Sequence, residues 1–464
     1  MTAPQDPSHD PVAGPPAEPA GAGSPRPSAR GRRQSTRLSI RMLRWIAPTW
    51  MTRDLRIIAA ARVVMSAARA LSAVAVPVYL AEQGYSAIAL GTLFLVVGLA
   101  SAVLSTAIGL AADRTGRRPF MIAVPFLAAL AAVAFAVSRD AWLLFPAAAL
   151  GSFGRGAGAG SGAVGPYQPA EAALTLEVVP QRRRNDAFGM LAFGSSVGAL
   201  AGGLLALTAP PATLRAGAAL SGYRPLFLIS AALALGAGLL ALGLREPPRR
   251  PLPEGRRRRV RFPRRSRPIL VKLWAANAVN GLAIGMFGPF ITYWFYRRYG
   301  VGAGEIGVLF AIINAATAGS TLAAAPLARR AGLVRTVASV RALQAVLLVP
   351  MVLAPTFALA GAVYLVRMAV QRIGLPLRQS YVVAMAHPEE RASVMALSQV
   401  PSQAAMAASP VLSGWLFDGV SLELPFEIAG ALQLLNAALF WIFFRRLPPR
   451  EERVAVADGG EAAG

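Results

Sequence analysis

The sequence predicts an all-α integral membrane protein with 12 transmembrane helices in two pseudo-symmetric six-helix bundles. Three observations support this fold class. Of the 464 residues, 55% are hydrophobic and 15% are charged, whereas a soluble protein carries about 25% charged residues. Twelve apolar runs are each long enough to cross about 30 Å of hydrocarbon. Basic residues gather between these runs, mostly in every second loop, as is typical of the cytoplasmic side of a membrane protein.

Composition also excludes several classes of function. The net charge of +25 would suggest nucleic-acid binding in a soluble protein. Here the basic clusters alternate with apolar runs, which membrane topology explains. We therefore expect no nucleic-acid partner. The chain has no cysteine and only two histidines, His9 and His387, which lie in a tail and a loop. We therefore expect no metal site and no disulfide. Neither histidine lies near a credible nucleophile, so we expect no enzyme.

Adenine-nucleotide chemistry is excluded by the same reading of the residues. The only lysine, Lys272, follows Val271 and not a glycine-rich stretch. The chain therefore lacks the loop that cradles phosphates in ATP-driven proteins. We expect no bound cofactor. If a carboxylate is buried in the membrane, transport can be coupled to the movement of protons.

The chain begins with a segment that cannot form a core. Residues 1–54 are predicted to be a disordered cytoplasmic tail, rich in Pro, Gly, Ala, Ser and Arg, with an interfacial helix at its end. In Leu38–Met51, Ile40 and Trp45 alternate with Arg41 and Arg44. This pattern suits a helix that lies on the inner leaflet.

The spans themselves follow as two groups of six. The first bundle occupies residues 55–245 and the second residues 270–446, with a basic cytoplasmic linker at 246–269 and a cytoplasmic tail at 447–464. The predicted spans are 57–80, 87–110, 119–137, 141–165, 187–208, 225–244, 270–296, 304–328, 333–354, 357–377, 392–417 and 425–445.

The distribution of basic residues predicts the orientation. With both termini in the cytoplasm, the external loops hold only five of the 47 basic residues. The stretch Arg245–Lys272 alone holds 12 of them, and we interpret it as a solvated linker beside anionic lipid headgroups. We therefore expect a multi-pass protein of the cell membrane, working as a monomer. Asp418 and Glu427 fall at external helix ends, where we expect solvated caps.

The two halves share an internal repeat. Gly84 precedes Gly91–Phe94 by seven residues, and Gly300 precedes Gly307–Phe310 by seven. The two sets lie 216 residues apart, and Gly116 and Gly332 coincide at the same offset. Two related six-helix halves predict a binding site near the midplane, between them.

A charged turn after the second span is the most informative motif. It contains Gly109, Asp113, Arg114, Gly116, Arg117 and Arg118 in the pattern G-x-x-x-D-R-x-G-R-R. The glycines permit close approach and a tight turn, and a carboxylate is stabilised beside a helix N-terminus. We expect Arg117 and Arg118 to face the cytoplasm. Its counterpart in the second half has Arg329 in place of Asp113.

This turn resembles the signature loop between helices 2 and 3 of the major facilitator superfamily, and the resemblance covers about residues 55–446. The run Arg155–Gly160 resembles that family's R-x-G-x-G pattern in helix 4. The resemblance implies transport by alternating access. It also implies that the six residues of the turn latch the cytoplasmic side closed.

Polar residues inside the apolar spans are costly and mark cavities or inter-helix contacts. The resemblance implies that helices 1, 4, 7 and 10 line the cavity, so the candidates for the substrate cavity are Arg69, Arg155, Glu171, Asn277, Asn280, Arg367 and Arg372. Glu171 is either a proton carrier or the partner of nearby arginines. Arg62 and Arg341 lie near span ends, where we expect them to snorkel to the surface.

Glycines stand on one side of the fifth span. Gly194, Gly198 and Gly202 are four residues apart, and Gly203 follows. Such a stripe permits close helix packing. It also resembles the antiporter motif of drug exporters, except that Ala199 replaces the motif's proline.

Together these features predict a secondary transporter of small molecules. We expect it to export amphiphilic or hydrophobic compounds, because the turn and the glycine stripe occur together. An alternative is a permease for a small organic anion, bound by the deep arginines. An alternative of another class is a membrane sensor or scaffold that does not transport.

Overall fold

The computed structural model describes residues 50–154, 165–209, 219–246, 263, 265–318, 333–385, 387 and 390–445. By its contacts the chain divides into two units, 1–51 and 52–464, and almost all described residues belong to the second. The predicted interfacial helix, most of the basic linker and the C-terminal tail lie outside the described residues.

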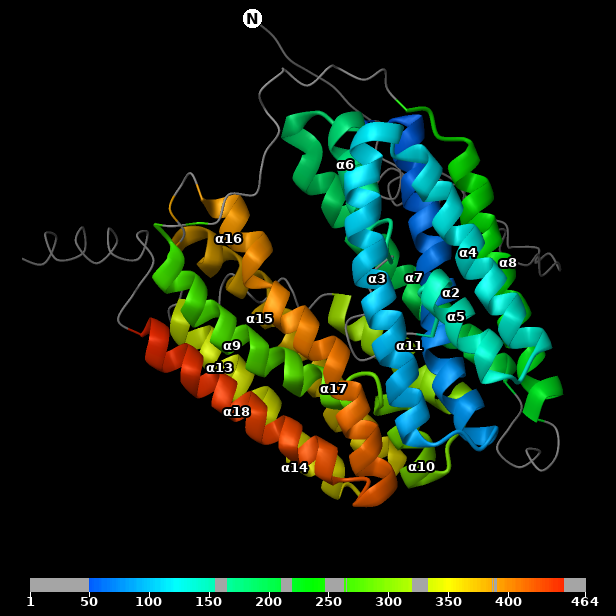
Figure 1. The fold of residues 1–464 in the computed structure, drawn as a ribbon, viewed down its shortest axis with the longest axis vertical. Coiled ribbons are helices and arrows are strands. Elements are labelled where there is room, and N and C mark those ends of the chain that lie inside the picture. The colour runs from blue at the N-terminus through cyan, green and yellow to red at the C-terminus, as the bar shows by residue number, and fades with distance from the viewer. Residues whose placement is uncertain are drawn as a thin grey trace, which may run out of the picture. The chain divides into compact units, whose positions relative to one another are not determined.

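Within the described residues every regular element is a helix (Figure 1). The first half contains α2 (Arg53–Glu82), α3 (Ala87–Thr115), α4 (Arg118–Val137), α5 (Ala141–Gly151), α6 (Gln168–Val178), η2 (Gln181–Arg183), α7 (Arg184–Leu205), η3 (Ala206–Thr208) and α8 (Ala219–Leu242). The second half contains α9 (Arg267–Phe287), α10 (Ile291–Tyr299), α11 (Ala303–Ala318), α13 (Leu333–Val346), α14 (Leu348–Leu353), α15 (Phe357–Met385), α16 (Arg391–Ser398), α17 (Val400–Gly419) and α18 (Leu424–Phe444).

The predicted fold class is confirmed, although the count of 12 spans is not. Eight helical stretches in the described residues are long and apolar enough to cross a membrane, and α5 and most of α11 are shorter apolar helices. The helices α15 and α17 coincide with predicted spans and have 29 and 20 residues. They are not among the eight.

Local chemistry explains where the helices begin. The Thr52 side chain accepts a hydrogen bond from the backbone N–H of Leu55, and Ser86 does the same for Ala89. Both residues are therefore N-caps, which satisfy N–H groups that lack a partner inside the helix. Proline stands in the first turn of α4 and of α18, where its missing N–H costs nothing.

One predicted span is broken where the sequence suggested a continuous helix. The span at 141–165 ends as a helix at Gly151, because Ser152 adopts a left-handed conformation with φ of 50°. The next helix in the described residues, α6, begins at Gln168, after Gly165 with φ of 101°. The predicted spans at 270–296 and 392–417 are likewise each made of two helices.

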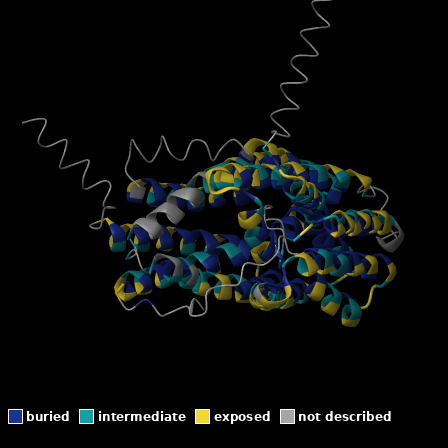
Figure 2. Ribbon diagram, turned by 90° about the horizontal axis from the view of Figure 1, so that it is seen from above, coloured by how far each residue is buried: buried dark blue, intermediate teal, exposed yellow. Residues whose placement is uncertain are grey.

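Burial follows the pattern of a protein surrounded by lipid. Large apolar side chains such as Leu99, Val103 and Leu110 are exposed along α3, and exposed residues lie on the outer sides of the helices (Figure 2). Trp142, Trp415 and Trp441 are exposed near helix ends. Tryptophan is enriched at this depth because its ring is apolar and its N–H is polar.

The halves repeat the same helix pairings. In the first half α2 contacts α7 and α8, and α4 contacts α5 and α8. In the second half α9 contacts α17 and α18, and α13 contacts α15 and α18. The helix starts keep the offset of the sequence repeat: α3 and α11 begin at 87 and 303, and α5 and α15 at 141 and 357, 216 residues apart in both cases. The two bundles are therefore pseudo-symmetric.

Candidate functional site

The two halves meet along two helix pairs, α3 with α17 and α7 with α11. Gly91 of α3 lies against the backbone of Pro410, and a methyl group there would collide with its carbonyl. At the other seam, a methyl group on Gly203 would lie 2.6 Å from the carbonyl oxygen of Gly307. Gly91 and Gly307 are the glycines that the sequence repeat related. The repeat therefore marks positions where the two halves approach each other closely.

A carboxylate also joins the halves. Asp418 at the end of α17 accepts hydrogen bonds of 2.9 Å from the backbone N–H groups of Ala87 and Ile88, the first residues of α3. We expected Asp418 to be a solvated cap, and instead it caps a helix of the opposite half. No signal in the sequence could have paired residues 331 positions apart.

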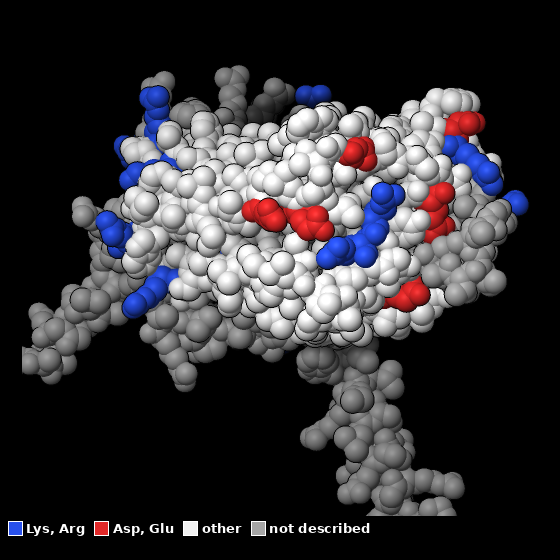
Figure 3. Space-filling model, turned by 90° about the horizontal axis from the view of Figure 1, so that it is seen from below, with Lys and Arg blue, Asp and Glu red and all other residues white. Residues whose placement is uncertain are grey.

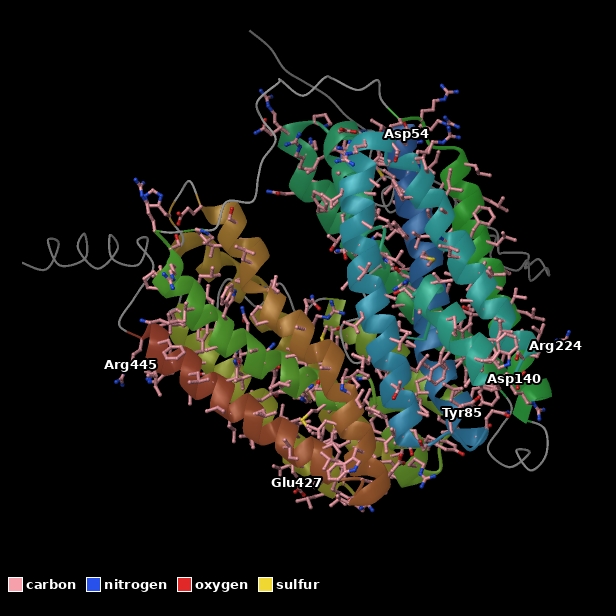
Figure 4. The ribbon with its side chains drawn as sticks, in the orientation of Figure 1. Asp54, Tyr85, Asp140, Arg224, Glu427 and Arg445 are labelled. Carbon is pink, nitrogen blue, oxygen red and sulfur yellow. The ribbon has the colours of Figure 1, made fainter. Side chains whose placement is uncertain are left out.

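These contacts lie at one end of the helices. Figure 4 places Tyr85, Asp140, Arg224 and Glu427 towards this end and Asp54 at the opposite end. Tyr85 donates a hydrogen bond of 2.6 Å to the backbone oxygen of Arg139, which ties together two of the segments that link helices there. Seen from this end, the surface is mostly uncharged, with a few acidic and basic side chains (Figure 3). In the predicted orientation this end is external.

The charged turn is bound within the first half. The backbone N–H groups of Arg117 and Arg118 donate to the carboxylate of Glu246 at 3.0 and 3.5 Å. The Arg118 side chain donates to the carbonyl of Leu242 at 2.8 Å, and Arg117 forms an ion pair with Glu177. Arg118 is exposed and Arg117 is partly exposed, and both also brace the turn against α6 and α8. That they face the cytoplasm stays a prediction.

The other residues of the turn complete its geometry. α3 continues through Asp113 and Arg114 and ends at Thr115, and Gly116 follows with φ of 104°, a conformation that favours glycine. Gly109 of α3 faces Pro169 of α6, since a methyl group added to Gly109 would be 3.9 Å from the Cβ atom of Pro169. The side chain of Asp113 lies outside the described residues.

Three buried polar groups from separate helices meet inside the first half. Arg62 of α2 forms an ion pair of 2.8 Å with Glu171 of α6 and donates a hydrogen bond of 2.6 Å to Ser195 of α7. The side chains of Arg62 and Glu171 are 11% and 1% exposed. We expected Arg62 to snorkel to the surface, and instead it is bound inside the first half. Among the described residues the second oxygen of Glu171, Oε1, has no hydrogen-bond partner.

Arg69 lies at the break between α5 and α6. Its Nη2 donates a hydrogen bond of 3.1 Å to the backbone oxygen of Ser152, just after α5 ends. A methyl group on Gly165 would collide with its guanidinium. The cation therefore lies where the carbonyl end of a helix dipole favours positive charge. Arg155 lies outside the described residues.

The deep arginines of the second half have neutral partners. Arg367 is fully buried and donates to the Gln344 backbone oxygen at 3.2 Å and to Gln433 Oε1 at 3.3 Å, with its guanidinium 4.1 Å from the centre of the Phe287 ring. Arg341 is also buried, donates to Asn436 and lies over Phe440. Arg341, like Arg62, does not snorkel.

The remaining cavity candidates also lie within the second half. Asn277 is buried and donates a hydrogen bond of 2.7 Å to the Ser398 backbone oxygen. Asn280 and Arg372 are half-buried. Each described partner of these candidates belongs to the same half as the candidate itself. That the candidates line one cavity between the halves stays a prediction.

The glycine stripe of α7 faces two neighbours. Gly198 and Gly202 lie against the carbonyls of Val63 and Ala67 of α2, whereas Gly203 lies against α11. Gly194 is less tightly packed, since an added methyl group would be 3.1 Å from a methyl of Val63.

The corresponding contact of the second half is built from glycines that we did not single out. Gly281 and Gly285 of α9 lie against Ser402 and Met406 of α17. The pair α2 and α7 in the first half corresponds to the pair α9 and α17 in the second. The glycines lie on the second helix of the pair, α7, in the first half and on the first helix, α9, in the second half. Their spacing of four was the signal that could have identified them.

Comparison with known proteins agrees with this architecture. The family model "Major Facilitator Superfamily" matches residues 58–371 and 273–463. Multidrug resistance protein MdtG of Citrobacter koseri is 23% identical over 386 residues, which cover 80% of this chain and 89% of that protein.

Solved structures of transporters share the fold at low sequence identity. A bacterial homologue of the human lysosomal transporter Spinster, in an inward-facing and unoccupied conformation, has a TM-score of 0.67 at 16% identity and covers 86% of this chain and 98% of its own. The nucleoside transporter NupG (D323A mutant) has a TM-score of 0.67 at 12% identity, covering 84% and 99%. The chain thus belongs to the major facilitator superfamily and is a multi-pass membrane transporter of small molecules, not an enzyme.

Proposed function

We propose that this transporter exports amphiphilic or hydrophobic small molecules across the cell membrane, as a monomer with both termini in the cytoplasm. The observation that carries the proposal is the pair of glycine seams, α3 with α17 and α7 with α11, which join the halves at one end. A transporter that rocks two bundles about a midplane site needs such a seam to seal one side at a time. The likeness to a multidrug resistance protein supports export.

The transport cycle follows from these contacts. When the external end opens, the backbone N–H groups of Ala87 and Ile88 must leave the carboxylate of Asp418. The charged turn then latches the cytoplasmic end, through Asp113 and the arginines beside it. The ion pair of Arg117 with Glu177 and the bonds to Glu246 hold the turn ready for that contact.

Coupling to protons is assigned to Glu171. Its carboxylate is buried and has one cationic partner, Arg62, from a different helix. Protonation would remove the charge that holds Arg62, and the ion pair that joins α2 to α6 would be lost. Because both helices belong to the first bundle, the loss of this ion pair would change the packing within that bundle, and we propose that this change links proton binding to rocking.

The organic-anion alternative receives less support. Arg69 and Arg367 already donate hydrogen bonds to oxygen atoms of their own half. An anionic substrate bound through these same nitrogen atoms would have to displace the bonds. We therefore favour a substrate held mainly by apolar and aromatic contacts.

The experiment is an accumulation assay with fluorescent amphiphilic cations, neutral compounds and organic anions. Cells that produce the protein should accumulate less of the amphiphilic compounds than cells without it, and the Asp113→Asn variant should remove the difference at equal protein level. Equal accumulation across the panel would contradict export. Selective movement of organic anions would favour the permease.

A further inference from the structure

The second half holds buried positive charge without acidic residues. Residues 306–388 contain seven arginines and no Asp or Glu. The acidic residues elsewhere in this half, such as Glu305, Asp418 and Glu427, stand at helix ends. Among the described residues, Arg367 of this half has no carboxylate partner of the kind that Glu171 provides for Arg62 in the first half.

Arg367 is the clearest case of this imbalance. Its described partners are a backbone carbonyl, the Gln433 side-chain amide and the face of Phe287, all of them neutral. Its remaining nitrogen, Nη1, is buried and has no hydrogen-bond partner among the described residues. A guanidinium does not lose its proton in a protein, so the charge cannot be removed by titration.

A second unused donor lies beside it on the same helix. The hydroxyl of Tyr364 is fully buried and also lacks a partner among the described residues. Tyr364 precedes Arg367 by three residues on α15, so the two side chains lie on one face of the helix. Buried donors are almost always paired, and two unused donors beside an uncompensated cation match the needs of an anion.

Neutral groups cannot supply what is missing. Gln433, the Gln344 carbonyl and the Phe287 ring stabilise the cation by their dipoles and π electrons but carry no net charge. A water molecule would satisfy the donors and leave the charge in a medium of low dielectric constant, which is costly. An anion does both.

We propose that the core of the second bundle binds one small monovalent inorganic anion, of the size of chloride, between Arg367 and Tyr364. The anion is a resident of the bundle and is distinct from the transported molecule. Complete burial of both side chains restricts the site to a small ion. Arg341, which binds Asn436 one helical turn from Gln433 on α18, adds to the positive potential.

The test uses the purified full chain in detergent, with sodium gluconate replaced stepwise by sodium chloride at constant ionic strength. Thermal unfolding should show a saturable rise of the midpoint, by about 5 °C, because a ligand that binds only the folded state stabilises it. Bromide should act as chloride does, and sulfate should not. No difference between chloride and gluconate in the wild type would overturn the proposal.

Two variants separate this site from general salt effects. Arg367→Gln should lose the chloride response, and its midpoint in gluconate should not fall below that of the wild type, since the uncompensated charge is gone. Tyr364→Phe should shift the response to several-fold higher chloride concentration. Arg62→Gln, in the other half, is the matched control and should keep the full response. An unchanged response in both Arg367→Gln and Tyr364→Phe would also overturn the proposal.

Discussion

The two bundles share a frame and differ in how they hold charge. Both pair equivalent helices, and both meet the opposite bundle through a glycine, Gly91 or Gly307, at the same position of the repeat. In the first half a buried arginine is neutralised by Glu171. In the second half Arg367 relies on neutral oxygen atoms and an aromatic ring. The shared features serve the movement that any rocking transporter makes, and the differing features carry the chemistry specific to each half.

The largest expected effect on transport comes from filling a seam, whereas the largest effect on stability comes from breaking the buried ion pair. Gly91→Leu forces a side chain against the Pro410 backbone, and such overpacking costs about 1–3 kcal/mol. Transport should fall by roughly tenfold or more, since about 1.4 kcal/mol corresponds to a factor of ten. Gly307→Leu should behave alike if the seams are equivalent. Transport assays of both variants check this.

Gly189→Leu is the matched control for the seam, because nothing lies within 4 Å of a methyl group added there. It should retain most of the activity. Equal loss in all three variants would mean that bulk anywhere is harmful and that the seams have no special role.

The next effect concerns the buried ion pair. Glu171→Gln leaves Arg62 without its carboxylate, and breaking a buried pair costs about 3–5 kcal/mol. The unfolding midpoint should fall clearly, and the double variant with Arg62→Gln should recover part of the loss. Thermal unfolding of the single and double variants measures the coupling between the two residues. A double variant as unstable as the sum of the singles would show that the pair contributes nothing.

A smaller effect is expected at the cap that joins the halves. Asp418→Asn keeps the shape of the side chain but removes the negative charge beside the α3 N-terminus, and such a charge stabilises by about 0.3–1 kcal/mol. The population should shift towards the state that is open on the external side. Because the chain contains no cysteine, single introduced cysteines report this through labelling without background. Unchanged labelling at the external end would argue against a role for the cap.

The smallest effect is a dependence of stability on pH. Desolvation acts to raise the pKa of Glu390, but hydrogen bonds from Ser266 and from the backbone N–H of Arg265 outweigh it and hold that pKa below the ordinary value of 4.5. The resulting stabilisation is present above about pH 4.5. It is lost as the pH falls through the lowered pKa of the folded state. Unfolding curves between pH 3 and 6 should show this loss in the wild type and less of it in Glu390→Gln.

Apolar runs were enough to predict an all-helical membrane fold, although not the number of spans or their breaks. Runs without charge can bury themselves only in lipid or against each other, so their ends were predictable from Ser86 or from the proline of α4. The break after Gly151 was not predictable, because Ser152 has no intrinsic preference for the left-handed conformation that ends α5. Tertiary contacts impose it.

Polar partners were harder to predict than helices. A sequence gives the depth of Arg62 in its span but not the carboxylate 109 residues away that binds it. The same limit applies to Asp418 and to the Gln433 amide of Arg367. The predicted cavity set shared a chemical type and a depth. Whether these side chains meet at one site depends on how each helix is rotated about its axis. The apolar pattern identifies the side of a helix that faces lipid, but not which polar residues of neighbouring helices face each other.

The central claim is that the bundles rock about a site near the midplane, and that the glycine seams close the external end and separate when that end opens. Spin labels on Val137→Cys and Val420→Cys would report the end where the seams lie, and labels on Thr115→Cys and Arg267→Cys the opposite end; all four sites are exposed. Distances measured by pulsed electron resonance, with and without a transported compound, should change in opposite directions at the two ends. Changes in the same direction, or none at either end during active transport, would contradict the account.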